Sequence, residues 1–449
     1  MLIMKKVISL LVILIGFSAS AQDKKWSLQE CVEHALENNI SILQSDLNVD
    51  LADIDKSQAV SDFFPNLNGN SSYNRNTGAN INPATNQFEN ETFKSMSASI
   101  NSSVNLSSGL RNWKNLQRAK LNQLAASYQL DKMKDDIALF VANSYLQILF
   151  NKEQLKVLNT QNDITKENIN RTQELVDAGV LPEGDLLEIK ATDATQLQQI
   201  IDAENALFIS KLGLAQLLKV QEYESFDIEE TDISLFSESI LSEKPTVIIE
   251  KAKEELNDIK IAESNYELAR KDLEIAKTSN FPTLAGFLGY NTRWSSSSLD
   301  ITTGEQIPFI DQLYLFDGTA LGLQLNVPVF NRNSVKNNIK RSRINVENNK
   351  YLLEQANLDL ESNVYQAYND ASSSKKAYEA ALKTEEARSL AFNYAQERYN
   401  VGLSNSFDYN QSRSQFENAQ SDVVRTKFDY IFKLKVLEFY FGIPITELN

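Results

Sequence analysis

The residue types that carry most enzyme chemistry are scarce in this chain. Its 449 residues include one histidine, His34, and one cysteine, Cys31. One residue of each type leaves no intramolecular disulfide and no zinc site built from several His and Cys ligands. The sequence also has no glycine-rich phosphate loop and no catalytic serine or cysteine motif. We therefore expect no enzymatic activity, no cofactor and no metal. We expect Cys31 to be a small buried residue and His34 to have a packing or surface role.

Charged residues are abundant in this chain, and acidic ones predominate. It carries 60 Asp and Glu against 44 Lys and Arg, which gives a formal net charge of −16. Phosphate binding needs clustered Lys and Arg, so this balance argues against a nucleic-acid partner. With so many acids, carboxylate pairs are frequent by number alone and do not indicate a catalytic site.

Residues 1–21 have the three parts of a secretory signal peptide. Two lysines precede an apolar run from Val7 to Phe17, and Ala19-Ser20-Ala21 forms a small-residue cleavage site. The run is too short for a membrane helix, and no cysteine stands at the cleavage point for a lipid. We expect an exported mature chain that begins near Gln22. No later apolar run is long enough for a membrane helix, so the expected destinations are the periplasm, the medium or the outer membrane.

Long helices must position any functional residue. The chain has 14 Gly and 8 Pro, about 5 % of its residues against a usual ~12 %. Ranges 110–178 and 332–400 contain neither, and each predicts a helix of about 100 Å with apolar residues three and four apart. Shorter helices of about 52 Å are expected from the cap Ser27 to Phe63 and over 185–219, 245–280 and 407–439. Each long helix should pack beside two stacked short ones in a coiled-coil-like bundle.

The sequence is duplicated. Phe64-Pro65-Asn66-Leu67 returns as Phe281-Pro282-Thr283-Leu284 at an offset of 217, and Gly179 returns as Gly402 at an offset of 223. A steady offset near 220 indicates an internal repeat over nearly the whole mature chain. We therefore divide the mature chain into a first repeat, a linker, a second repeat and a tail, over residues 22–219, 220–244, 245–439 and 440–449.

Each repeat also contains a β-hairpin, over residues 65–107 and 282–330. Within 93–107 the even positions from Met96 to Leu106 are apolar except Ser102, and the odd positions from Ser95 to Ser107 are polar, which is the period of a strand with two unlike faces. We expect the four strands over 65–74, 93–107, 284–294 and 321–329, with polar loops over 75–92 and 295–318.

A soluble sheet with one wet face would also alternate in this way. Membrane-length strands and the lack of an apolar partner sheet favour a bilayer instead. Tyr73, Tyr290 and Trp294 would then suit an aromatic girdle.

Four strands cannot close on themselves, and an open edge in lipid leaves backbone groups unpaired. The chain must therefore assemble with copies of itself. Two copies would give about eight strands and a filled lumen, and three would give about twelve strands with room for a channel. The number of strands per chain does not by itself distinguish a dimer from a trimer.

The element order, together with the segment from Ser27 to Asn39 (SLQECVEHALENN), resembles the TolC family of outer-membrane efflux and secretion channels. The resemblance implies an α+β membrane protein of the outer membrane that extends into the periplasm. Three chains would share one twelve-stranded β-barrel, and their helices would form a periplasmic α-barrel. Residues 220–244 and the C-terminus would form a band around the waist of the tube. The implied function is the passive exit duct of a tripartite efflux or type I secretion system. Its partners would be a periplasmic adaptor (membrane fusion) protein, an inner-membrane pump and outer-membrane lipid.

The resemblance also assigns roles to the two turns between a long and a short helix. In the family these turns form the periplasmic entrance and meet the adaptor. Here the adaptor-facing tips would be Gly179, Val180, Leu181, Gly402 and Leu403. Gly179 and Gly402 would in any case cap the preceding helices.

The periplasmic gate would comprise Asp185, Tyr399, Ser404, Asp408 and Gln411. Asp408 matches a position whose carboxylates ring the entrance, where they favour cations, and Gln411 stands at a second ring position. Tyr399 and Asp185 match positions that pair across the closed gate, so we expect a hydrogen bond between them. Ser404 replaces the gate arginine of the family, so the salt bridge of the closed gate is missing. Asp185 and Asp408 would also serve as ordinary negative charges at helix starts.

Two other classes remain as alternatives. A soluble periplasmic coiled-coil adaptor or scaffold would explain the helices and the signal peptide. It would not explain four membrane-length alternating strands placed symmetrically in two repeats. An outer-membrane enzyme fits less well, because the sequence offers no catalytic site.

Overall fold

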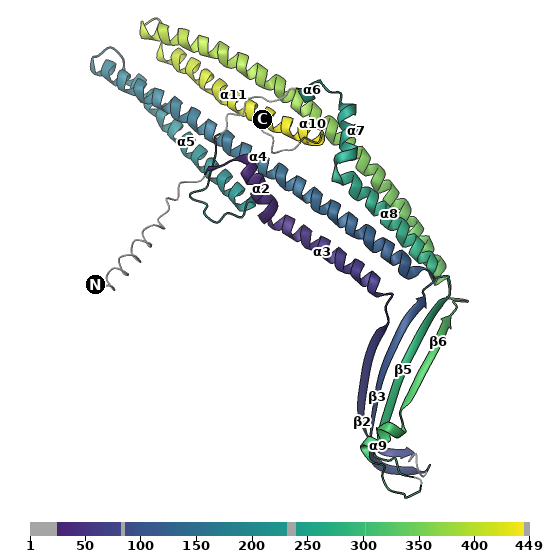
Figure 1. Cartoon of the computed structure of the whole chain (residues 1–449). Helices are drawn as coiled ribbons and strands as arrows, with labels where there is room; N and C mark the ends of the chain where they lie inside the picture. Colours follow the sequence, from purple (N-terminus) through teal and green to yellow (C-terminus); the bar gives the residue numbers. More distant parts are fainter. Residues whose placement is uncertain (1–24, 82–85, 231–238, 301, 444–449) are drawn as a thin grey trace, which may run out of the picture. The chain divides into compact units, whose positions relative to one another are not determined.

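The computed structural model describes residues 25–81, 86–230, 239–300 and 302–443 (Figure 1). The expected signal peptide lies outside these residues, as do parts of the linker 220–244 and of the tail 440–449. The chain divides into two compact units. One comprises Met1–Asp46, Gln129–Ile259 and Ala356–Asn449, and the other comprises Leu47–Tyr128 and Lys260–Gln355. Each unit takes segments from both expected repeats, so the units do not follow the repeat boundaries.

The two repeats have helices of equal length. The long helices are α4 (Arg111–Asp177) and α10 (Ser334–Asn400), with 67 residues each. The short helices that follow them are α5 (Glu183–Leu217) and α11 (Ser406–Tyr440), with 35 residues each. All four lie within a few residues of the ranges expected from the spacing of Gly and Pro.

The first short helix of each repeat is broken, where we expected it to be continuous. The first is divided into α2 (Leu28–Asn38) and α3 (Ile40–Ser61), and the second into α7 (Pro245–Glu255) and α8 (Asn257–Thr278). The expected cap at Ser27 is present as a capping box with Glu30.

Asn39 explains the first break. Its backbone is extended, its Oδ1 accepts a hydrogen bond from the Ser41 N–H (2.9 Å), and its Nδ2 donates to the Leu217 carbonyl (2.9 Å). The residue thus leaves the helix to cap α3 and to satisfy a carbonyl at the end of α5. The second break falls on Leu256, which is also extended and is buried in a core cluster.

Two hydrophobic clusters hold the first unit together. One gathers α2, α4 and α5 around Val141, Tyr145 and Leu214, and it includes Cys31, which is fully buried as expected. His34 packs against the edge of Trp26, with ring centroids 5.1 Å apart. The other cluster gathers α7, α10 and α11 around Ile248, Val364 and Leu437.

Small elements fill the segments between the two repeats. Strand β1 (Lys25–Trp26) pairs in parallel with β4 (Asp227–Ile228), and α6 (Ser239–Ser242) precedes α7.

The second unit contains a four-stranded antiparallel sheet. Its strands are β2 (Asn66–Ile81), β3 (Phe88–Ser107), β5 (Thr283–Ser295) and β6 (Gly318–Asn326), in the order β2-β3-β5-β6. The expected loop 75–92 is mostly strand, because polar residues continue the ladder: the Thr77 and Thr92 hydroxyls lie 3.0 Å apart across β2 and β3. The expected loop 295–318 contains a helix, α9 (Phe309–Leu315).

The register separates the two faces of the sheet. On one face Met96 pairs with Trp294, Ile100 with Tyr290, and Leu284 with Leu325. The other face carries polar pairs such as Asn68 with Asn101 and Ser97 with Arg293. The alternation in the sequence therefore produces one mostly apolar and one mostly polar face over the four strands.

Candidate functional site

The two turns that join long and short helices have the same backbone structure. Gly179 and Gly402 adopt φ values of +72° and +74°. In each turn the glycine N–H donates three residues back and the next N–H donates five residues back, from Val180 to Leu175 (2.8 Å) and from Leu403 to Arg398 (2.8 Å). This is a Schellman motif, which ends a helix with a left-handed residue. A Cβ on either glycine would meet nothing within 4 Å, so conformation and not space requires glycine here.

Exposed apolar residues occupy both turns. Val180, Val401 and Leu403 are exposed, and Leu181 is half-buried. Apolar groups held in water by tightly capped turns are typical of a surface that another protein covers. The five residues expected at the tips therefore lie in two matching turns.

Asp185 joins the start of α5 to the start of α11. It lies in the first turn of α5, and its Oδ1 accepts a hydrogen bond from the Ser406 hydroxyl (2.8 Å). The N-terminus of α5 favours this negative charge through the helix dipole. The bond places the starts of α5 and α11 side by side.

Within one chain Tyr399 does not donate the expected hydrogen bond to Asp185, and pairing across an assembled gate stays a prediction. Among the described residues the buried Tyr399 hydroxyl has no hydrogen-bond partner. The Asp185 carboxylate instead accepts a hydrogen bond from the Ser406 hydroxyl. The Tyr399 ring instead stacks on Tyr409, with centroids 4.9 Å apart. Asp185 still acts on Tyr399 through its charge: burial first, and then the Asp185 carboxylate, raise the pKa of the Tyr399 hydroxyl.

The other gate candidates lie on the first turns of α11 or just before it. The Asp408 backbone N–H donates to the Asn405 side chain (2.8 Å), which caps α11, and the Asp408 carboxylate is exposed. Gln411 is exposed one turn further on, and Ser404 is half-buried in the turn. Within one chain these three residues form no constellation, so their role as rings stays a prediction.

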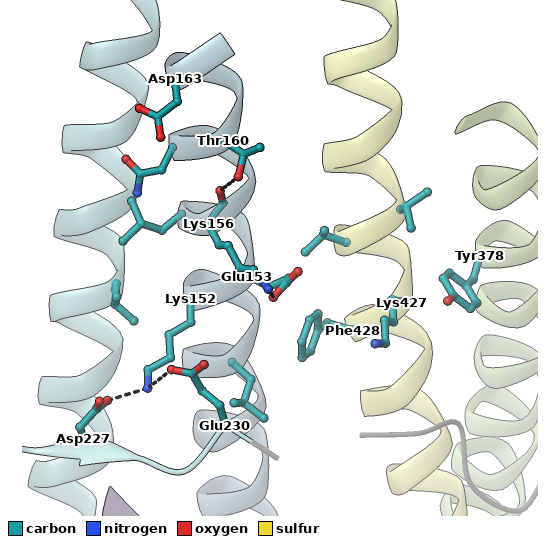
Figure 2. Close-up of a pocket in the computed structure, with 16 residues that line it drawn as sticks. Lys152, Glu153, Lys156, Thr160, Asp163, Asp227, Glu230, Tyr378, Lys427 and Phe428 are labelled. Carbon is teal, nitrogen blue, oxygen red and sulfur yellow. Dashed lines mark hydrogen bonds and ion pairs between the residues drawn. The ribbon is translucent and has the colours of Figure 1, made fainter. Parts of the chain in front are cut away.

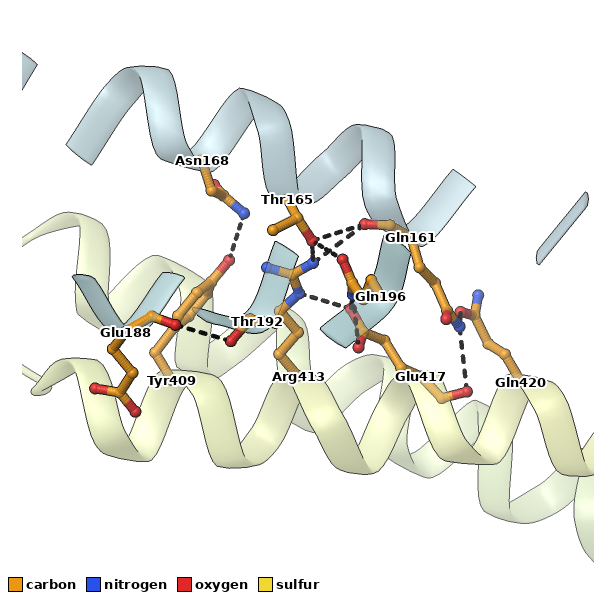
Figure 3. A network of polar contacts seen from close by, with 10 residues as sticks. All are labelled: Gln161, Thr165, Asn168, Glu188, Thr192, Gln196, Tyr409, Arg413, Glu417 and Gln420. Carbon is orange, nitrogen blue, oxygen red and sulfur yellow. Dashed lines mark hydrogen bonds and ion pairs between the residues drawn. The ribbon is translucent and has the colours of Figure 1, made fainter. Parts of the chain in front are cut away.

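A buried polar network that we did not anticipate ties α4, α5 and α11 together (Figure 3). Arg413 on α11 is 4 % exposed, and its guanidinium donates to Glu417 (2.7 Å), to the Gln161 carbonyl (3.2 Å) and to the Thr165 hydroxyl. Gln196 on α5 donates to the Glu417 carboxylate (3.3 Å). The guanidinium therefore holds three helices at one level.

Tyr409 extends this network toward the turns. Its hydroxyl accepts from the Asn168 side chain (3.1 Å), and burial raises its pKa above the ordinary value. One sequence signal could have indicated the network, because Gln161 with Thr165 and Arg413 with Glu417 are polar pairs four residues apart, and such residues lie side by side on a helix.

Comparisons with known proteins decide the family. The model of the outer membrane efflux protein family matches residues 31–218 and 248–441, which is most of the chain. This chain belongs to the outer membrane efflux protein family. It is 22 % identical over 413 residues to outer membrane protein TolC of Vibrio cholerae, covering 91 % of this chain and 89 % of that protein. It is also 24 % identical to the toxin and drug export protein A of Aggregatibacter actinomycetemcomitans, with 91 % and 84 % covered.

Solved structures of outer-membrane channels share the fold. The outer membrane protein VceC of Vibrio cholerae aligns with a TM-score of 0.76 at 15 % identity, covering 93 % of this chain and 96 % of that one. The MtrE outer membrane channel of Neisseria gonorrhoeae aligns with a TM-score of 0.73 at 17 % identity, covering 93 % and 89 %. The fold is thus that of TolC-type channels, and the chain is an outer-membrane efflux channel that extends into the periplasm. The family membership removes the soluble adaptor alternative.

Two structural observations accompany this membership. In the described part of the chain, no helix combines the length and the apolarity needed to cross a bilayer. Nor do the described residues bring together three His, Cys, Asp or Glu side chains able to hold a metal ion.

A groove of about 1000 Å³ lies between helices of this efflux protein on the same unit as the turns (Figure 2). At one end Lys152 pairs with Asp227 (2.8 Å) and with Glu230 (3.2 Å), and Lys211 also pairs with Asp227 (2.9 Å). Burial alone would raise the pKa of Asp227, but the two ammonium groups lower it below the ordinary value. These ion pairs fasten β4 to α4 and α5.

Proposed function

We propose that three copies of this chain form the exit duct of a tripartite efflux or type I secretion system. The sheet is the observation that carries the proposal. Strands β2 and β6 are each paired on one side only within the described residues, while one face of the sheet is mostly apolar. Unpaired strand edges beside an apolar face are not stable in a bilayer, so further copies must supply the missing partners.

The helices next to the edge strands in the chain, α3 before β2 and α10 after β6, support assembly through the same sides. Exposed apolar residues recur every seven positions on α3 (Ile40, Leu47, Ile54) and on α10 (Ile344, Tyr351, Leu358, Tyr365). A strict seven-residue period is the pattern of a coiled-coil seam. We propose that α3 of one copy packs against α10 of the next, and that three copies close the ring.

The turns at Gly179 and Gly402 would form the periplasmic entrance. We propose that Val180, Leu181 and Leu403 meet a hairpin of a periplasmic adaptor, which links the duct to an inner-membrane pump. Transport through the duct is then passive, and the pump supplies the energy. One relative is named a toxin and drug export protein, which is consistent with this class of assembly.

Asp408 would set the charge at the entrance. In a three-fold assembly its exposed carboxylate becomes a ring of three, with Gln411 one turn beyond. Such a ring favours cations and repels anions. Asp185, Tyr399 and Ser404 would fix the position of the turn that carries Asp408, through the Ser406 bond and the Tyr409 stack.

Planar-bilayer recording tests the channel and the ring together. Purified protein should give discrete conductance steps with a preference for cations. Asp408→Asn should lower that preference while steps persist, and Asp422→Asn, an exposed acid further along α11, should leave it unchanged. Absence of steps would contradict the duct. Conductance steps whose cation preference is unchanged in Asp408→Asn would contradict the proposed carboxylate ring but not the duct.

A further inference from the structure

Helix α9 is fixed to the membrane sheet by its own hydrogen bonds. Gln312 is fully buried; its Nε2 donates to the carbonyls of Ser295 (3.0 Å) and Ile307 (2.7 Å), and its Oε1 accepts from the Ser295 N–H (2.8 Å). The Thr292 hydroxyl donates to the Leu313 carbonyl (2.7 Å). The connection between β5 and β6 is therefore built as part of the sheet end (Figure 1).

The helix lies over the apolar face of the sheet. Thr292 is on the same face of β5 as Leu288 and Tyr290, because strand residues two apart share a face. Trp294, two residues further, makes an edge contact with Phe309 of α9, with ring centroids 5.7 Å apart. The polar face on the other side is not where α9 packs.

Most of α9 is apolar and open to solvent. Ile310 is 57 % and Tyr314 is 77 % exposed, and Phe309 and Leu315 are exposed as well. A seven-residue helix that presents this much apolar surface needs a cover. Asp311, the charged residue of α9, is exposed too. Whatever surface covers α9 must therefore offer both apolar and polar groups, as the interface of a bilayer does.

The length of the strands places α9 at such a layer. The apolar positions of β5 extend from Leu284 to Trp294. Ten residues span about 33 Å along a strand, or about 25 Å across a bilayer at the usual tilt. That is the height of a complete outer-membrane apolar band. Trp294 then lies at its outer boundary, and Phe309 of α9 packs beside it.

We propose that α9 is an interfacial helix that inserts its apolar side chains into the outer leaflet. The partner is the lipid surface itself, at the boundary between head groups and acyl chains. The inference rests on the proposed function in one respect, namely that the apolar face of the sheet meets lipid. It adds that the β5–β6 connection turns outward onto the membrane and not inward over the pore.

Spin labels on single cysteines in lipid nanodiscs test this. The sites are Ile310→Cys on α9, Leu323→Cys on the apolar face of β6, and Val401→Cys on a periplasmic turn. All three residues are exposed. Cys31 is buried, and the unsubstituted chain measures its background labelling. The readout is the ratio of collision rates with oxygen, which concentrates in lipid, and with a water-soluble nickel chelate.

The proposal expects a high oxygen-to-nickel ratio at 310 and 323 and a low ratio at 401. A lipid-like ratio at 323 with a water-like ratio at 310 overturns the proposal for α9 and leaves the membrane sheet intact. Low collision rates with both reagents at 310 also overturn it, because α9 would then be covered by protein. A water-like ratio at 323 overturns the membrane role of this face, and the α9 proposal with it.

Discussion

Removal of the Arg413 guanidinium should loosen the entrance end of the helical unit. Arg413→Met keeps the apolar stem but leaves the Glu417 carboxylate unpaired, with 19 % of that side chain exposed. Breaking a buried ion pair from one side costs roughly 3–5 kcal/mol. We take about 3 kcal/mol, because the partial exposure of Glu417 lets water replace some of the lost bonds.

Hydrogen exchange measured by mass spectrometry is the suitable assay, because it reports local opening without requiring reversible unfolding of a membrane assembly. A loss of 3 kcal/mol corresponds to about 150-fold faster exchange. We expect that increase in α11 over residues 406–420 and in the facing parts of α4 and α5. Peptides from α8 should not change.

Two further variants separate the unpaired charge from simple loss of packing. Arg413→Met with Glu417→Gln removes the orphaned charge and keeps an oxygen for the Gln196 amide, so most of the protection should return. Arg425→Met breaks an exposed pair with Asp422 on the same helix and should change exchange by a few-fold at most. Exchange in Arg413→Met within two-fold of the unsubstituted chain, or no recovery in the double variant, would refute the reasoning.

Three more outcomes follow from the structure. Gly402→Ala should speed exchange in its turn roughly fivefold, the effect of about 1 kcal/mol for a non-glycine residue at positive φ, and unchanged exchange there would show that the turn is not held at that conformation. Because the pKa of Asp227 is lowered in the folded chain, its ion pairs stabilise the fold above the unfolded pKa and lose that effect as the pH falls through the folded value. The melting temperature of Asp227→Asn should accordingly depend less on pH in the acid range than that of the unsubstituted chain, and equal slopes would contradict this. Leu358→Glu on the α10 stripe should shift native mass spectra toward monomer, whereas Phe140→Glu on α4 should not, because α4 has neighbours of its own chain on both sides; equal effects would argue against the stripe as a seam.

Helix lengths and sheet faces could be predicted from the sequence because they depend on local rules. Gly and Pro mark the ends of α4 and α10, and the alternation from Ser95 to Ser107 placed Ile100 and Asn101 on opposite faces. These signals are periodic and need no knowledge of distant contacts.

The features that escaped prediction depend on contacts between distant residues. The break at Asn39 needs the carbonyl of Leu217, 178 positions away, and no Gly or Pro marks it. The Arg413 network joins residues about 250 positions apart, and the bond from Ser406 to Asp185 joins residues 221 positions apart. Helix α9 was not predicted for another reason, since its hydrogen bonds to the sheet run from the Gln312 and Thr292 side chains to backbone groups, which no sequence period reveals.

Native mass spectrometry of the detergent-extracted protein tests the central claim most directly. Three chains without the expected signal peptide have a mass of about 145 kDa. We expect this trimer to be the dominant species and to be released only with detergent. A monomer of about 48 kDa, or protein recovered without detergent, would contradict the shared membrane sheet and the duct built on it.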